Sequence, residues 1–224
     1  MTTPSSDWLL WQLADSAFPS GGFAHSAGLE AANQLGEIST ADDLKSFIDA
    51  SLWNVGRGGV PFVGAACREP EKAAEFDDRL DLLLNHHVAN RASRAQGQAM
   101  LASAAKAFDL PALAEFRKCS QRGEVAGHLP VVLGLLAGQL EISPDAAGKL
   151  LIFMTLRGIV SAAVRSSIVG PIQGQSIQAE CAATADRVWE TCRSLGIDDA
   201  AAASPLVDLM QGVQDRLYSR LFMS

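Results

Sequence analysis

The chain has 224 residues and a formal net charge of -7, with 48% hydrophobic and 19% charged residues. This length and composition predict a globular protein with a substantial core and exclude a disordered chain. The acidic balance argues against nucleic-acid binding, since proteins of that class are more often basic.

The first residues, MTTPSSDWLLWQLADS, lack the basic start and the apolar stretch of a secretory signal. No window approaches 18 uninterrupted apolar residues, so we expect no membrane span. Four widely spaced cysteines without a CxxC pair indicate reduced, mostly buried thiols; these are Cys67, Cys119, Cys181 and Cys192. Together these features predict a cytoplasmic protein.

Helical patterns follow one another along the whole chain, and no segment shows sustained period-two alternation. Glycines and Pro61 after residue 55 are expected to kink or end a helix there, and VGPIQGQ (169–175) is expected to be a loop. No repeat or long linker divides the chain. The sequence predicts an all-α fold, a single-domain irregular bundle of about ten helices over residues 1–224. Helices are expected near 8–14, 23–34, 44–55, 71–85, 86–108, 129–140, 144–169 and 176–195, with a short helix that begins at Pro111 and a last one that begins at Ser204-Pro205.

The segment AFPSGGFAHSAGLE (17–30) combines features of a bend and of a functional site. Pro19, Gly21 and Gly22 predict a tight bend, because glycine adopts positive φ without steric cost. We expect this bend to present Phe23, His25 and Ser26, while Gly28 lets a neighbouring segment come close.

A serine hydrolase is one alternative for this segment. AHSAG (24–28) has alanine where a nucleophile elbow has its first glycine, and no strand is predicted before it. His25 and Ser26 are adjacent and do not face each other on a helix, so Ser26 would need a distant histidine. This alternative stays open, whereas the phosphate-binding loop motifs are absent.

A metallochaperone that binds nickel through His25, His86 and His128 is a second alternative. His86 and His87 are adjacent and would point about 100° apart on a helix, and no H-x3-H spacing occurs. The alternative to metal binding is a purely structural role, with one histidine on the surface and one that caps a helix or lies in the core.

Three later segments suggest surfaces rather than catalysis. RASRAQGQAM (91–100) places Arg91 and Ala95 on one helical face, with Gln96 beside them. GHLPVVLG (127–134) puts His128 at the start of the most apolar helix, where its side chain would cap free amides. VRSSIVGPIQGQ (164–175) fits a turn or a docking surface.

The last residues are apolar and aromatic with arginines between them: Leu217, Tyr218, Arg220, Leu221 and Phe222. Such a terminus either folds back on its own body or enters a partner's groove. The sequence favours neither alternative over the other.

Taken together, the ordered motifs resemble those of the UreF family of urease accessory proteins. LLWQLADSAFPSGGFAHSAGLEAANQLG is similar to the family's opening signature, RASRAQGQAM to its Arg-x-Ser-x-x-Gln-Gly segment and GHLPVVLG to its Gly-His-x-Pro segment. AAVRSSIVGPIQGQ resembles the family's late loop and RLFMS its ending.

The resemblance implies a non-enzymatic, all-helical scaffold that forms a homodimer, binds UreD (also called UreH) and recruits the GTPase UreG. The assembly would modulate the GTPase and deliver nickel to apo-urease, with no cofactor or metal site of the chain's own. The resemblance implies a partner-binding tail at about 212–224, and Glu30 and Arg91 are expected to be exposed charges facing UreG. The expected partner-binding residues are Pro19, Gly21, Gly22, Phe23, His25, Ser26, Gly28, Glu30, Arg91, Gln96, His128, Tyr218, Arg220, Leu221 and Phe222.

Overall fold

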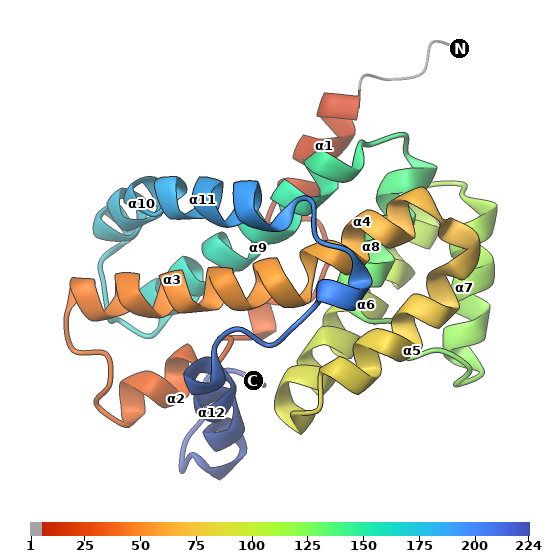
Figure 1. Ribbon diagram of the computed structural model, residues 1–224. Coiled ribbons are helices and arrows are strands. Elements are labelled where there is room, and N and C mark those ends of the chain that lie inside the picture. The colour runs from red at the N-terminus through yellow and green to blue at the C-terminus, as the bar shows by residue number, and fades with distance from the viewer. Residues whose placement is uncertain (1–5) are drawn as a thin grey trace.

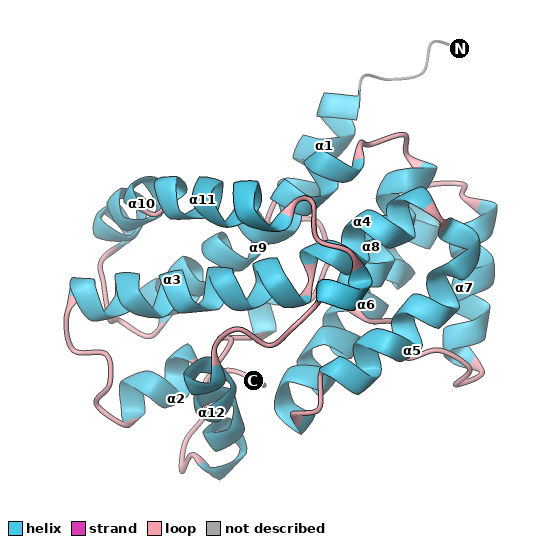
Figure 2. Cartoon of the chain, in the orientation of Figure 1, coloured by secondary structure: helices cyan, strands magenta, loops and turns pink. Residues whose placement is uncertain are grey.

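A computed structural model describes residues 6–224, and within that range the regular structure is entirely helical (Figure 2). The predicted all-α class is confirmed. Residues 1–5 lie outside the described part of the chain. They are the first residues of MTTPSSDWLLWQLADS, the segment in which we expected no signal peptide. The α-helices are α1 Ser6–Ala14, α2 Leu29–Gln34, α3 Ala41–Gly58, α4 Val60–Arg68, α5 Ala73–Leu83, α6 His87–Ala107, α7 Pro111–Gln121, α8 Leu129–Gln139, α9 Pro144–Arg165, α10 Pro171–Glu180, α11 Ala182–Cys192 and α12 Pro205–Val213.

Helix α8 forms the centre of one half of the molecule and packs against α4, α6 and α9 (Figure 1). Every residue from Leu129 to Ala137 is buried, in agreement with the nearly uniform apolar sequence. Glycine allows α4 to lie very close, because a Cβ at Gly134 would be 2.4 Å from the carbonyl oxygen of Val63. Interior packing at this density leaves no room for a larger residue there.

Helix α9 connects the two halves of the bundle and contacts α3, α4, α8 and α10. Within residues 6–224 it is the one helix long and apolar enough to cross a membrane by length and composition, which our expectation of no such segment overlooked. Most of its apolar window, 61%, is buried against other helices, as in the core helix of a globular protein.

Helix boundaries follow local sequence signals in several places. Thr40 and Asp43 form a capping box at the start of α3, with the Asp43 amide donating to Thr40 Oγ1 at 3.1 Å. The side chain of Ser143 accepts from the Ala146 amide at 3.2 Å and caps α9. The expected break near Pro61 is confirmed, because α3 ends at Gly58 and α4 begins at Val60.

One predicted loop and two predicted helices are wrong in their bounds. The predicted loop 169–175 contains the first turn of α10, since Pro171 occupies the start of the helix rather than ending one. The predicted helix 176–195 is divided at Cys181, where ψ is -6° instead of the α-helical value of about -42°. The predicted helix 23–34 is also interrupted, for a reason that concerns the candidate site.

All four cysteines are free thiols. Cys181 and Cys192 are buried, whereas Cys67 and Cys119 are partly exposed, so the expectation of burial holds for two of them. Burial raises the pKa of the Cys192 thiol, which keeps it protonated and weakly reactive at neutral pH.

Candidate interaction site

The bend between α1 and α2 lies on the surface of α6. The buried ring of Phe18 stacks on Phe108 at a centroid distance of 6.4 Å, and Ser103 Oγ donates to the carbonyl of Pro19 at 2.9 Å. Gly21 has a φ of +73°, and a Cβ there would lie 3.2 Å from the Cβ of Ala99. The bend therefore needs a glycine at position 21 for both conformation and close approach.

A short 3₁₀ helix, Gly22–Ala24, follows the bend, and the side chains within and after it face either solvent or the interior. Phe23 points outward and is 73% exposed, whereas His25 and Ser26 are buried. Of the three side chains that we expected the bend to present, only Phe23 is available on the surface.

The predicted helix 23–34 is wrong because the chain turns into the left-handed region at Ala27 (φ +56°) and Gly28 (φ +88°). Helix α2 begins only after this turn, at Leu29. A Cβ on Gly28 would lie 2.9 Å from the backbone nitrogen of Gln211 in α12, so the expected close neighbour is present.

At Gly22 the backbone needs no positive φ, and a Cβ would meet nothing closer than 3.5 Å. The tight bend therefore depends on Gly21 rather than on Gly22.

Residues 217–224, here called the C-terminal segment, fold back onto this bend beside α2 and α12 (Figure 1). The Met223 amide donates to the Ala24 carbonyl at 2.8 Å. Ser26 donates twice to the backbone oxygen of Ser224, from its amide at 2.5 Å and from Oγ at 3.0 Å. Of the two alternatives left open by the sequence, the structure adopts the folded-back one.

Glu30 anchors the same segment from inside the protein. Its carboxylate accepts from the amides of Leu221 at 2.6 Å and Phe222 at 3.2 Å, and from Gln214 Nε2 at 2.6 Å. With 6% of its surface exposed, Glu30 is a buried structural acid. The expectation that Glu30 is exposed is therefore wrong, because a charge inside a motif looks the same in sequence whether it faces solvent or backbone amides.

Parts of the C-terminal segment remain on the surface. The ring of Phe222 is buried and that of Tyr218 is fully exposed, with Leu221 63% exposed. The segment thus has an inner side that contributes to the core and an outer side that is free for contacts.

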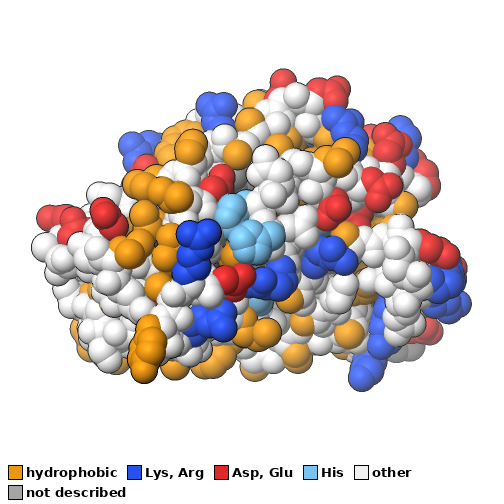
Figure 3. Space-filling model, turned by 90° about the horizontal axis from the view of Figure 1, so that it is seen from below, with side chains coloured by type: hydrophobic (Ala, Val, Ile, Leu, Met, Phe, Trp, Pro, Cys, Tyr) orange, Lys and Arg blue, Asp and Glu red, His pale blue; other side chains and the backbone are white. Residues whose placement is uncertain are grey.

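Arg91 lies on the surface next to this segment and pairs with Asp215 through both terminal nitrogens, at 2.8 and 3.1 Å. His87 Nε2 and Arg220 contact the same carboxylate at 3.2 and 3.3 Å. Figure 3 shows this mixed cluster, with histidine, arginine and acidic side chains adjacent on one face. The hydrogen bond and charge of Arg91 lower the pKa of Asp215, which keeps its carboxylate ionised at neutral pH.

His128 does not lie on a contact surface, although the sequence suggested it as a partner-binding residue. It is completely buried, with Nδ1 3.1 Å from Ser93 Oγ and Nε2 3.0 Å from Asp81. The amides at the start of α8 are capped by the buried carboxylate of Asp77, which accepts from His128 N at 2.7 Å and Gly127 N at 2.8 Å. The expected capping by His128 is wrong, because Asp77 comes from a distant helix that the local sequence does not reveal.

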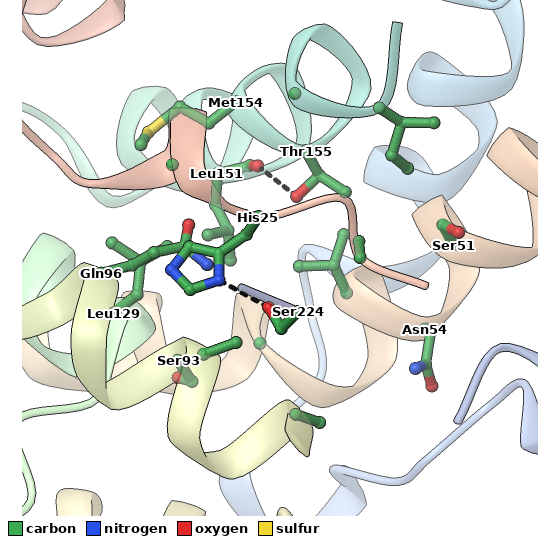
Figure 4. Close-up of a pocket in the computed structure, with 18 of the residues that line it drawn as sticks. His25, Ser51, Asn54, Ser93, Gln96, Leu129, Leu151, Met154, Thr155 and Ser224 are labelled. Atoms are coloured by element: carbon green, nitrogen blue, oxygen red, sulfur yellow. Dashed lines mark hydrogen bonds between the residues drawn. The ribbon is translucent and has the colours of Figure 1, made fainter. Parts of the chain in front are cut away.

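A cavity of about 370 Å³ lies behind the bend, between α3, α6, α8, α9 and α12 (Figure 4). Apolar side chains such as Leu129, Leu151 and Met154 form much of its wall. His25 lines the cavity with Nδ1 2.5 Å from Ser224 Oγ, and burial together with the positive charge of Arg91 lowers its pKa. Gln96 also lines the cavity.

Sequence reasoning missed this cavity, because lining residues such as Ser51, Asn54 and Thr155 belong to no motif.

Neither chemical alternative finds support in the geometry. Ser26 is completely buried and its hydroxyl donates to the backbone oxygen of Ser224, while the adjacent His25 ring contacts Ser224 rather than Ser26. Within residues 6–224, no group of three or more His, Cys, Asp or Glu side chains is placed to hold a metal ion. His86 and His87 lie next to each other, with ring centroids 4.9 Å apart.

Comparison with known proteins identifies relatives over nearly the whole chain. A family model described as UreF matches residues 38–182. The chain is 37% identical over 221 residues to "Urease accessory protein F" of Arabidopsis thaliana, covering 97% of this chain and 92% of the relative. It is 34% identical over 219 residues to the protein of that name from Oryza sativa subsp. indica, covering 96% and 84%. With "Urease accessory protein UreF" of Bacillus sp. (strain TB-90) the identity is 29% over 225 residues, covering 96% and 97%.

Proposed function

The chain belongs to the UreF family of urease accessory proteins, and we propose that it acts as a non-enzymatic scaffold in urease maturation. In this role it binds a UreD-type protein, recruits and modulates the GTPase UreG, and supports nickel insertion into apo-urease. The observation that carries the proposal is similarity to proteins named as urease accessory proteins over 96–97% of the chain.

The architecture is consistent with a scaffold. Two of the segments that resemble family motifs, the opening one and the ending, meet at the bend, where buried anchors hold exposed side chains in place. Glu30, Ser26 and Phe222 act inside, while Phe23 and Tyr218 face outward. Aromatic and arginine side chains are typical of the centres of protein interfaces. We therefore assign partner contact to the outward-facing set: Phe23, Arg91, Tyr218, Arg220 and Leu221.

The remaining residues of the proposed site support this surface from within. Gly21 and Gly28 give the backbone its course, and His25, Ser26 and Glu30 attach the C-terminal segment to it. Substitution of these residues would weaken partner binding by releasing the surface, without removing a direct contact.

The chain is proposed to work in the cytoplasm as a homodimer, without a cofactor of its own. Nickel would pass through the assembly as cargo. The chain contacts neither nucleic acid nor membrane in this proposal, in keeping with its net charge of -7 and the buried course of its most apolar long helix.

Co-expression with a UreD-type and a UreG-type protein, followed by size-exclusion chromatography with light scattering, tests the scaffold. We expect a stable complex that contains two copies of this chain. A serine-directed probe added to the purified chain should leave Ser26 unlabelled. A chain that elutes alone in the presence of both partners would contradict the proposal, and labelling of Ser26 would favour the hydrolase alternative.

A further inference from the structure

Arg165, the last residue of α9, carries a guanidinium group for which residues 6–224 supply no acceptor. It makes no hydrogen bond and no ion pair in that range, and its Nε atom is completely buried without a partner. A guanidinium has five N–H donors in a rigid planar fork. Because buried donors without acceptors cost free energy, the position of this arginine needs a physical reason.

The surroundings of Arg165 hold the cation in place but do not satisfy its donors. Its Cζ atom lies 3.7 Å from the ring centroid of Phe23 and 4.4 Å from that of Phe222. These rings come from the bend and from the C-terminal segment, the two elements of the candidate interaction site. Stacking on aromatic faces stabilises a guanidinium while its N–H groups stay available for an acceptor in its plane.

The C-terminal end of a helix favours a positive charge, but this effect does not explain why Arg165 lacks a hydrogen-bond acceptor. Arg157, on the same helix, provides a comparison, because burial lowers the pKa of both side chains. Arg157 donates to the carbonyl of Ala14, whereas Arg165 donates to nothing in the described chain. Arg165 also lines the cavity together with Gln96, whose carboxamide likewise makes no hydrogen bond within residues 6–224.

We propose that Arg165, where it lines the cavity beside Phe23, binds a carboxylate, and that an acidic side chain of a partner protein supplies this carboxylate. A carboxylate matches the planar fork of arginine and accepts two parallel hydrogen bonds from it. Phe23 lies beside the site with 73% of its surface exposed, and an exposed aromatic ring next to an arginine is a common centre of protein interfaces. The inference rests on the proposed function, since it specifies the chemistry by which the same surface recognises its partner.

Removal of the guanidinium tests the proposal in the intact complex. Arg165→Gln should weaken the affinity for the UreD-type or the UreG-type protein by about tenfold or more, because charge-assisted hydrogen bonds are lost. Arg187→Gln is the matched control, since Arg187 is an exposed arginine on α11 that pairs with Asp49. Arg165→Lys keeps the charge and the aromatic contacts but lacks the fork, and its affinity should fall between those of the wild type and Arg165→Gln.

A titration of the isolated chain with acetate separates the two sources of a carboxylate. Saturable acetate binding by the wild type but not by Arg165→Gln would support the carboxylate site, and unchanged partner affinity of both Arg165 variants beside it would assign the site to a small acid and overturn the partner side chain. Unchanged affinity of both Arg165 variants for the partners, together with no acetate binding, would overturn the inference and leave the scaffold function intact. Failure of the wild type to bind any partner would instead overturn the proposed function, and acetate would then decide the carboxylate site alone.

Discussion

The carboxylate of Glu30 accepts a hydrogen bond of 2.6 Å from the backbone amide of Leu221, which lies 191 positions further along the chain. This contact joins the start of α2 to the C-terminal segment. It makes the outward-facing surface a product of two distant parts of the sequence that only the fold brings together.

Loss of this anchor should destabilise the protein. Glu30→Ala leaves the amides of Leu221 and Phe222 without an acceptor, and Gln214 Nε2 keeps only its bond to the Phe222 carbonyl. We therefore expect the free energy of unfolding to fall by about 3 kcal/mol. Glu37→Ala, at an exposed glutamate just after α2, is the control and should change it by less than about 0.5 kcal/mol. Chemical denaturation of both variants makes the comparison, and equal stabilities would contradict the anchoring role.

The two glycines of the bend region should respond differently to alanine. Gly28→Ala forces a side chain into a φ of +88° and against the backbone of Gln211, and should cost about 2 kcal/mol or more. Gly22→Ala meets nothing within 3.5 Å and should cost less than about 1 kcal/mol. Thermal unfolding would measure both, and a larger loss at Gly22 would show that the backbone course is different.

The aromatic residues of the C-terminal segment should separate stability from binding. Phe222→Ala removes a ring that is 4% exposed and should lower the free energy of unfolding by about 3 kcal/mol. Tyr218→Ala removes a fully exposed ring, so stability should stay within about 0.5 kcal/mol of the wild type. Affinity for the UreD-type protein should nevertheless fall in Tyr218→Ala. Wild-type affinity in this variant would exclude Tyr218 from the interface.

Because Phe222 is buried, removal of the end of the chain would affect stability as well as partner binding. Removal of residues 218–224 takes away a buried ring and the contacts of Ser224, so the shortened chain should melt earlier as well as bind less. Truncation therefore does not separate binding from stability, and single substitutions on the outer side of the segment do.

Stability should depend on pH through His25. Burial and Arg91 lower the pKa of His25 in the folded protein, while in the unfolded chain it is about 6.5. The unfolded state therefore binds the proton more readily between these two values. The stability that neutral His25 contributes is fully present above about pH 6.5, and it is lost as the pH falls towards the pKa of His25 in the folded protein. His25→Asn should show a smaller loss of stability than the wild type over this window, and identical pH profiles would contradict the assignment.

Elements with local signals were predictable from the sequence. The apolar run of α8, the capping box of α3 and the glycine break before α4 each depend on neighbouring residues. The turn at Ala27 was missed because alanine normally favours helix, and contact with α12 overrides that preference here.

The candidate site was predictable only in part for the same reason. The motif positions at the bend and in the C-terminal segment do meet in space, but sequence does not tell which side chains point inward. Glu30 and His128 were misjudged because their partners come from distant segments. Arg165 could have been noticed as an arginine without an acid nearby in sequence, although its isolation depends on the tertiary fold.

Urease activation in cells tests the central claim most directly. Apo-urease would be co-expressed with matched UreD-type and UreG-type proteins in a host without its own urease genes, with and without this chain, and urease activity and bound nickel measured. We predict active, nickel-containing urease only when the chain is present. Equal activity and nickel content without it would contradict the account.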